Sequence, residues 1–247
     1  MTKSLDHFEN SWDNQVRAES YAKLEFPNTY YLAYRDLPKI ISEHVKGNKA
    51  IDFGCGTGRS TRFLKQLGLD AIGIDISQDM LQIAMNNDEG GDYRLVSNGK
   101  YDHLGIGQFD LVQSIFTFDN IPGWDNRTNI LKGLSRLLNE TGKMILLDAT
   151  PELYINEWAS FSTKNFPDNW AAKTGDIVCD IMLDVEDNRP VEDIYWTVPD
   201  YHKLFKKAEL TLDATYKPLG SKDEPFNWVS ETEMAPWIIF VLNNSRN

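Results

Sequence analysis

The sequence predicts an α/β fold with a mostly parallel sheet, and three observations support this prediction. Short apolar strands alternate with helices between residues 50 and 147. One strand, residues 109–116, is nearly all apolar, as expected for a strand buried on both faces. A glycine-rich loop, residues 54–58, separates the first strand from the helix that follows it. Because strands joined by helices pair in parallel through right-handed crossovers, we expect one sheet covered by helices.

The elements of this sheet are predicted from apolar periodicity and from capping signals. Residues 8–45 have helical spacing with a break near Pro27. Ser77 is a suitable N-cap, with Asp79 in the first turn of the helix that it begins. The expected strands are residues 50–53, 71–74, 93–96, 109–116 and 143–147, and the expected helices are residues 61–67, 77–86 and 126–138.

The alternating pattern ends after Pro151. Residues 151–196 are rich in aromatic side chains and form an insertion built onto the sheet, in which residues 176–185 and 191–197 are predicted to pair as a hairpin. Thr197 and Asp200 indicate a capping box for a helix that reaches Lys207. Residues 210–216 and 236–242 are expected to be the closing strands. We therefore treat residues 1–247 as a single domain.

Composition restricts the class of protein. The chain has 247 residues, 41% of them hydrophobic, and a net charge of −12, which disfavours a nucleic-acid partner. We see no signal peptide and no apolar run of about 20 residues, so we expect a cytoplasmic protein without a membrane partner. The two cysteines are expected to be free thiols, and the four histidines lack metal-ligand spacing, so no metal is expected. The oligomeric state stays open.

The loop after the first strand carries the most specific signal. Gly54, Gly56 and Gly58 have the spacing G-x-G-x-G, whereas a dinucleotide-binding loop would place a glycine where this chain has Arg59. Asp75 ends the second strand, where a carboxylate can accept hydrogen bonds from ribose hydroxyls. The pattern favours a nucleoside-containing cofactor at the carboxyl edge of the sheet.

These segments resemble the motifs of class I S-adenosylmethionine-dependent methyltransferases. Residues 50–59 are similar to the first motif of that family and residues 73–77 to the second. Residues 109–112 are similar to the fourth-strand motif, and residues 142–146 to the turn into the fifth strand. The resemblance is close over residues 45–150, holds as a pattern of helix and strands over 200–243, and is loose elsewhere.

The resemblance implies a three-layer sandwich around a seven-stranded, Rossmann-like sheet of order 3-2-1-4-5-7-6 with strand 7 antiparallel. It implies S-adenosylmethionine as the cofactor and methyl transfer to an oxygen, nitrogen or carbon of a small molecule. Residues 1–45 would be a helical cover, and residues 151–196 an acceptor-side insertion. A general base is optional in such a displacement, because the sulfonium already activates the methyl group.

The resemblance also assigns residues. Asp52 would order the glycine loop, Asp75 would hold the ribose, and Ser97 or Asn98 would replace the acidic residue that often contacts the adenine amino group. The full set expected to bind the cofactor is Asp52, Gly54, Cys55, Gly56, Thr57, Gly58, Asp75, Ile76, Met80, Ser97, Asn98, Ile115 and Phe116.

Aromatic residues are the candidates for binding the acceptor, although each is also compatible with core packing. Tyr21 and His202 are the candidates for a catalytic role, Tyr21 by its place in the helical cover and His202 because it follows the insertion. The expected acceptor-binding set is Tyr21, Tyr30, Trp158, Trp170 and Trp196.

Three other functions are weighed. An NAD-dependent oxidoreductase is disfavoured because Arg59 stands where its loop would have a glycine. A non-catalytic cofactor-binding module is disfavoured because the loop and Asp75 are intact. A protein or nucleic-acid methyltransferase is the third. Residues 117–120 read Thr-Phe-Asp-Asn after the fourth strand, not the Asn-Pro-Pro-Tyr type of tetrapeptide that marks amide or exocyclic-amine methylation in macromolecules.

Overall fold

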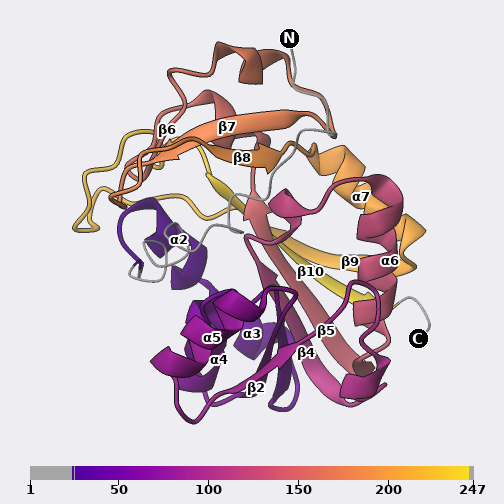
Figure 1. The fold of residues 1–247 in the computed structure, drawn as a ribbon. Coiled ribbons are helices and arrows are strands. Elements are labelled where there is room, and N and C mark those ends of the chain that lie inside the picture. The colour runs from indigo at the N-terminus through magenta and orange to yellow at the C-terminus, as the bar shows by residue number, and fades with distance from the viewer. Residues whose placement is uncertain (1–23, 25, 245–247) are drawn as a thin grey trace.

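A seven-stranded sheet forms the centre of the computed structural model, which describes residue 24 and residues 26–244 (Figure 1). The strand order is β3-β2-β1-β4-β5-β10-β9, with β10 antiparallel to both of its neighbours. This order confirms the predicted 3-2-1-4-5-7-6 arrangement, with β9 and β10 as its sixth and seventh strands. The strands are β1 (Lys49–Phe53), β2 (Asp70–Asp75), β3 (Asp92–Leu95), β4 (Phe109–Ile115), β5 (Leu138–Ala149), β9 (Leu210–Tyr216) and β10 (Trp237–Asn244).

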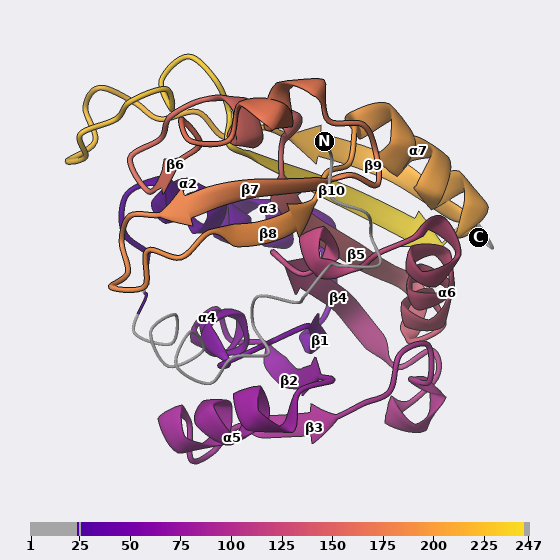
Figure 2. The same cartoon turned by 45° about the horizontal axis from the view of Figure 1, so that its top comes forward.

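Helices cover both faces of the sheet because successive residues of each strand point to opposite sides. In β5, Ile145 and Leu147 pack in a core with α2, α3 and α4, whereas Met144 and Leu146 pack in a second core with α6 and α7. Figure 2 shows α6 and α7 side by side, well away from α4 and α5. The helices are α2 (Thr29–Arg35), α3 (Leu37–His44), α4 (Arg59–Gln66), α5 (Gln78–Asn87), α6 (Trp124–Ser135) and α7 (Val198–Lys207).

The helix caps agree with the sequence. Ser77 caps α5 by accepting a hydrogen bond from the Met80 amide, and Thr197 caps α7 by accepting one from the Asp200 amide. None of the described helices is long and apolar enough to cross a membrane, and α6 spans 12 residues.

One boundary differs from the prediction. Helix α6 ends at Ser135 and β5 begins at Leu138, so the predicted helix over 126–138 is too long and the predicted strand from 143 too short. Leu138 has helical spacing in the sequence, but it pairs with Phe109 at a register irregularity between β4 and β5. Tertiary pairing outweighs the local pattern here.

The insertion forms its own small sheet rather than extending the central one. Strands β6 (Phe161–Ser162), β7 (Ile177–Met182) and β8 (Val191–Ile194) are antiparallel, which confirms the predicted hairpin with shorter strands. Figure 1 shows β7 and β8 lying across the carboxyl ends of β4 and β5. The short helix η3 (Phe118–Asn120) follows β4 and packs against β8, and η4 (Pro151–Ile155) connects β5 to the insertion. The insertion therefore covers the edge where parallel sheets bind ligands.

Trp196 lies at the junction of the insertion and α7. Its side chain is buried, and the Arg127 guanidinium lies 4.1 Å from the centre of its ring. Trp124 packs against it with ring centroids 4.5 Å apart. Trp170, by contrast, is 71% exposed.

We predict that Trp196→Ala lowers the free energy of unfolding by about 3–5 kcal/mol, because it leaves a cavity and strips apolar cover from a buried guanidinium. Urea unfolding followed by circular dichroism measures this. Trp170→Ala is the matched control and should change stability by less than about 0.5 kcal/mol. Equal stability of the two variants would contradict the packing described here.

Candidate active site

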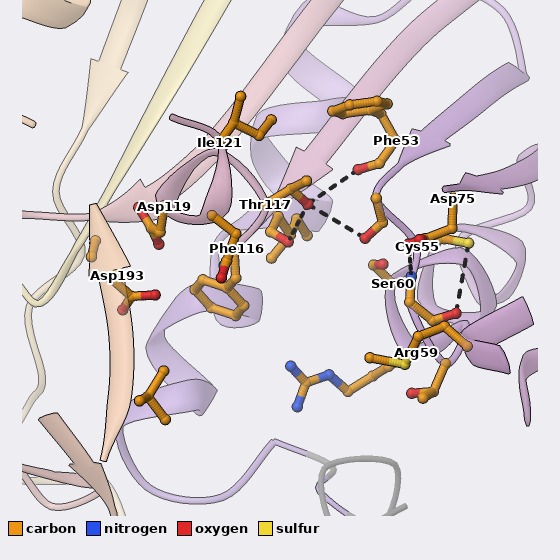
Figure 3. A pocket seen from close by; sticks show the side chains of 18 of the residues that line it. Phe53, Cys55, Arg59, Ser60, Asp75, Phe116, Thr117, Asp119, Ile121 and Asp193 are labelled. Carbon is orange, nitrogen blue, oxygen red and sulfur yellow. Dashed lines mark hydrogen bonds between the residues drawn. The ribbon is translucent and has the colours of Figure 1, made fainter. Parts of the chain in front are cut away.

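A cavity of about 520 Å³ opens at the carboxyl ends of β1, β2 and β4 and extends beneath β7 and β8. One end is lined by the loop after β1 and by the end of β2. The other end is lined by η3, β7 and β8. Figure 3 shows Cys55 and Asp75 at one side, Asp119 and Asp193 at the other, and Phe116 and Thr117 between them.

The glycine loop leaves open space in the cavity. Gly56 has φ of 51°, and a Cβ built at this position would meet nothing within 4 Å, so the space beside it is free for a ligand. Gly54 has φ of 69°, and a Cβ there would clash with the Thr117 side chain. The Thr117 hydroxyl donates to the Phe53 carbonyl at 3.3 Å, which keeps the loop close to the end of β4.

Asp75 joins the loop to the second strand. Its Oδ2 accepts a hydrogen bond from the Gly56 amide at 2.8 Å, and its Oδ1 accepts one from the Ser77 amide at 2.9 Å. Both bonds fix the carboxylate at the cavity wall. Charge-assisted bonds of this kind are short and strong, so the carboxylate is preorganised for a ligand.

Asp52 acts behind the loop rather than in the cavity. Its side chain is fully buried, and its Oδ2 accepts hydrogen bonds from the hydroxyls of Ser60 and Thr61, both at 2.6 Å. Burial raises the pKa of Asp52 to about 6, although the two hydroxyls favour its charged form. The carboxylate ties β1 to the start of α4, which agrees with the loop-ordering role expected for it.

The residues around Asp75 supply an apolar platform. Ile76 lines the cavity although 52% of it is exposed, and Met80 lines it from a buried position. Asn98 lines the cavity. Ser97 is exposed outside it, and its backbone forms an isolated β-bridge with Lys100. Ile76 and Met80 thus offer an apolar surface to a ligand at this end of the cavity.

Phe116 divides the cavity at the end of β4. Its φ of 55° is unusual for a bulky residue, and such backbone strain is concentrated at functional sites. The Phe116 ring packs against Trp237 at 4.6 Å and against Tyr30 at 5.8 Å between centroids. Ile115 precedes it and also lines the cavity.

Three carboxylates at the far end were missed by the sequence reasoning. Asp119 of η3, Asp180 of β7 and Asp193 of β8 line the cavity and are 8%, 2% and 9% exposed. A usable signal was present, because Asp180 and Asp193 lie in strands that are otherwise largely apolar, and aspartate is depleted from strands.

Arg59 was also missed as a site residue. It lines the cavity beside the loop and is 8% exposed. Its guanidinium donates to the Leu24 carbonyl at 3.2 Å and lies 5.3 Å from the centre of the Tyr30 ring. In the sequence analysis, Arg59 served only to show that the third glycine of a dinucleotide-binding loop is missing.

Comparison with known proteins agrees with this geometry. Residues 51–146 match the family model described as a methyltransferase domain. The ubiquinone biosynthesis O-methyltransferase of Methylococcus capsulatus is 37% identical over 82 residues, which are 32% of this chain and 35% of that protein. The CcbJ methyltransferase of Streptomyces caelestis has a TM-score of 0.67 at 15% identity, covering 97% of this chain and 100% of that one. An S-adenosylmethionine-dependent methyltransferase from Clostridium acetobutylicum has a TM-score of 0.62 at 16% identity, covering 91% and 94%.

Residues 51–146 therefore match a methyltransferase domain, and the chain shares the fold of solved S-adenosylmethionine-dependent methyltransferases. It spans about a third to a half of the length of the ubiquinone biosynthesis O-methyltransferases that it matches. The family model ends at residue 146, before the insertion, so the match includes the residues at the glycine-loop end of the cavity and Asp119, but not Asp180 or Asp193.

The residues that line the cavity fit S-adenosylmethionine. The open space at Gly56, the fixed carboxylate of Asp75 and the exposed face of Ile76 suit the methionine part, the ribose and the adenine ring in turn. Arg59 would face the carboxylate of the methionine part. Of the other residues expected to bind the cofactor, Cys55, Thr57 and Phe116 line the cavity, and Gly58 does not.

The acceptor candidates are only partly brought to the site. Tyr30 lines the cavity, and Tyr21 lies outside the described residues. None of the three tryptophans lines the cavity, because Trp158 is in the core with its indole N–H donated to the Leu153 carbonyl at 2.8 Å, and Trp196 is in the second core. Trp170 is on the surface.

His202 is not brought to the site either. It is exposed on α7, with its ring 6.2 Å from that of Phe240. Trp158 and Trp196 thus pack in the two cores of the sheet, and core packing is one of the two roles that the sequence allowed.

Burial dominates the electrostatics at and near the far end of the cavity. It raises the pKa of Asp193 to about 7, against the opposing hydrogen bond from the Tyr154 hydroxyl at 3.2 Å. It also raises the pKa of Asp148 to about 6, where the Tyr201 hydroxyl donates at 2.7 Å. The pKa of Asp119 lies well above its usual range, because of burial and the nearby charge of Asp148.

This raised pKa predicts a pH-dependent stability. The folded state binds the Asp193 proton more tightly than the unfolded chain, so its contribution is fully present below about pH 4 and is lost as the pH rises through 7. We expect Asp193→Asn to be more stable than the wild type at pH 8, by at most about 4 kcal/mol, and to keep less than half of this advantage at pH 5.

Thermal unfolding of the ligand-free protein at both pH values measures the effect. Glu192→Gln is the matched control, because it removes the same charge from the adjacent residue of β8, which does not line the cavity. An advantage of Asp193→Asn that is the same at pH 5 and pH 8 would contradict the assigned pKa.

Proposed function

We propose that this chain transfers the methyl group of S-adenosylmethionine to a small molecule. The observation that carries the proposal is that a single continuous cavity contains both the cofactor residues and a separate polar end. A ligand at the far end would share that cavity with the cofactor, which is the arrangement that a direct displacement requires.

The cover of the cavity favours a small acceptor over a macromolecule. Strands β7 and β8 lie over the carboxyl edge of the sheet, and Tyr30 of α2 lines the cavity from another side. A volume of about 520 Å³ lies within the range typical of small-molecule sites. The net charge of −12 also opposes the approach of a nucleic acid. Relatives named as O-methyltransferases of ubiquinone biosynthesis agree with a small-molecule acceptor.

The residues between the two ends would position the reactants. When bound, S-adenosylmethionine supplies a methyl group on a positively charged sulfur that a nucleophile can displace. Phe116, Tyr30 and Trp237 form a group of aromatic rings between the ends, with Phe116 and Trp237 4.6 Å apart. Aromatic faces attract a cation and exclude water, so this group suits a sulfonium and shields the transfer.

Methyl-labelled S-adenosylmethionine tests the proposal. We expect label to enter the metabolite fraction of a cell extract, separated by ultrafiltration, and not its protein or nucleic-acid fraction. Asp75→Ala should reduce the labelling strongly, because its carboxylate lines the cofactor end. Asp70→Ala, at the opposite end of β2, is the matched control and should label like the wild type. Label found only in the macromolecular fraction would refute a small-molecule acceptor.

A further inference from the structure

The acceptor end of the cavity is lined by acidic side chains from separate segments. Asp119 comes from η3 and Asp193 from β8, two elements that pack against each other, and both side chains are more than nine-tenths buried. Figure 3 shows them together on the wall opposite Asp75. Asp180, on the neighbouring strand β7, lines the same end.

Asp193 has an unused hydrogen-bonding position that faces the cavity. Its Oδ2 accepts a hydrogen bond from the Tyr154 hydroxyl at 3.2 Å. Among the described residues, no donor reaches its second oxygen. Buried carboxylate oxygens normally have a partner. A lone acceptor that lines a ligand cavity therefore points to a donor on the ligand.

The positive charge of Arg127 lies near this cluster but does not act on Asp193. Arg127 acts on both Asp119 and Asp148. However, its Nε donates to the Ile121 carbonyl at 2.6 Å, and its guanidinium stacks on the Trp196 ring. Asp148 in turn accepts from the Tyr201 hydroxyl. Burial, Tyr154 and Asp148 influence the charge on Asp193, and no cation among the described residues compensates it.

Burying carboxylates without a partner is costly, and either protons or a ligand cation relieves the cost. A metal ion is a poor candidate, since no three acidic, histidine or cysteine side chains in the described part of the chain form a group that could hold one. The rest of this end is apolar and includes Phe161, Met182 and Val191. Carboxylates set in an apolar wall suit an organic cation.

We propose that the acceptor end binds an organic ammonium group between Asp119 and Asp193, so that the methyl acceptor is an amine-bearing small molecule. This rests on the proposed function, because it names the acceptor class of the same cavity. The ammonium N–H groups would donate to the free oxygen of Asp193 and to Asp119. The hydrocarbon part would pack on Phe161 and Met182.

Calorimetry with three matched probes tests the proposal. Phenethylamine, 2-phenylethanol and phenylacetate share one ring and chain length but carry a positive, neutral or negative group. They are titrated into the full chain saturated with S-adenosylhomocysteine at pH 8. We expect phenethylamine to bind about tenfold more tightly than 2-phenylethanol, as expected for one charged hydrogen bond, and phenylacetate not to bind.

Substitutions then assign the effect to the cluster. Asp193→Asn and Asp119→Asn should each weaken phenethylamine about tenfold or more while leaving 2-phenylethanol unchanged. Glu192→Gln removes a charge from the adjacent residue of β8, outside the cavity lining, and should leave all three affinities unchanged. Retained binding of S-adenosylhomocysteine shows that each variant is folded.

Three results would overturn the ammonium site: no binding of phenethylamine at millimolar concentration, equal binding of amine and alcohol, or equal loss with Glu192→Gln. The cofactor titration separates the two proposals. A protein that binds S-adenosylhomocysteine but does not prefer the amine disproves the acceptor class alone. A protein that fails to bind S-adenosylhomocysteine disproves the proposed function.

Discussion

The hydrogen bond from the Gly56 amide to the Asp75 carboxylate joins the loop after β1 to the end of β2, and the cofactor end of the cavity depends on this connection. It holds the glycine backbone against the strand, where no side chain intrudes, and it fixes a charged acceptor at the cavity wall. Asp52 supports the same loop from inside the protein through Ser60 and Thr61. The buried carboxylate of Asp52 thus shapes the loop, and the partly exposed carboxylate of Asp75 is available to a ligand.

At the far end of the cavity, the carboxylates do not support the fold. They reduce the stability of the ligand-free protein. Burial raises the pKa of Asp193 to about 7, so this group gains charge in the neutral range at a free-energy cost. Asp148, which does not line the cavity, has a pKa raised to about 6 for the same reason. Natural proteins retain such costly groups mainly where function requires them. The insertion that carries Asp180 and Asp193 is packed through Trp158 into the core that it shares with α2, α3 and β5.

The cofactor half of the site could be predicted from the sequence because its residues are close together along the chain. Three glycines and Asp75 lie at fixed distances from two strands whose apolar runs are easily recognised. The acceptor half depends on tertiary structure, since Asp119, Asp180 and Asp193 meet only when the insertion folds over the sheet. For the same reason the tryptophans were ambiguous: an aromatic-rich insertion can line a pocket or fill a core, and Trp158 and Trp196 fill cores. Helix α6 was overextended because Leu138 keeps helical spacing while pairing in β5.

Calorimetric titration of the full chain with S-adenosylhomocysteine and, separately, with NAD tests the central claim most directly. The structure predicts one S-adenosylhomocysteine site and no binding of NAD. It also predicts that Asp75→Ala weakens S-adenosylhomocysteine about thirtyfold, or about 2 kcal/mol, through the loss of ribose hydrogen bonds that water partly replaces. An unchanged dissociation constant in Asp75→Ala, or binding of NAD in place of S-adenosylhomocysteine, would contradict the account.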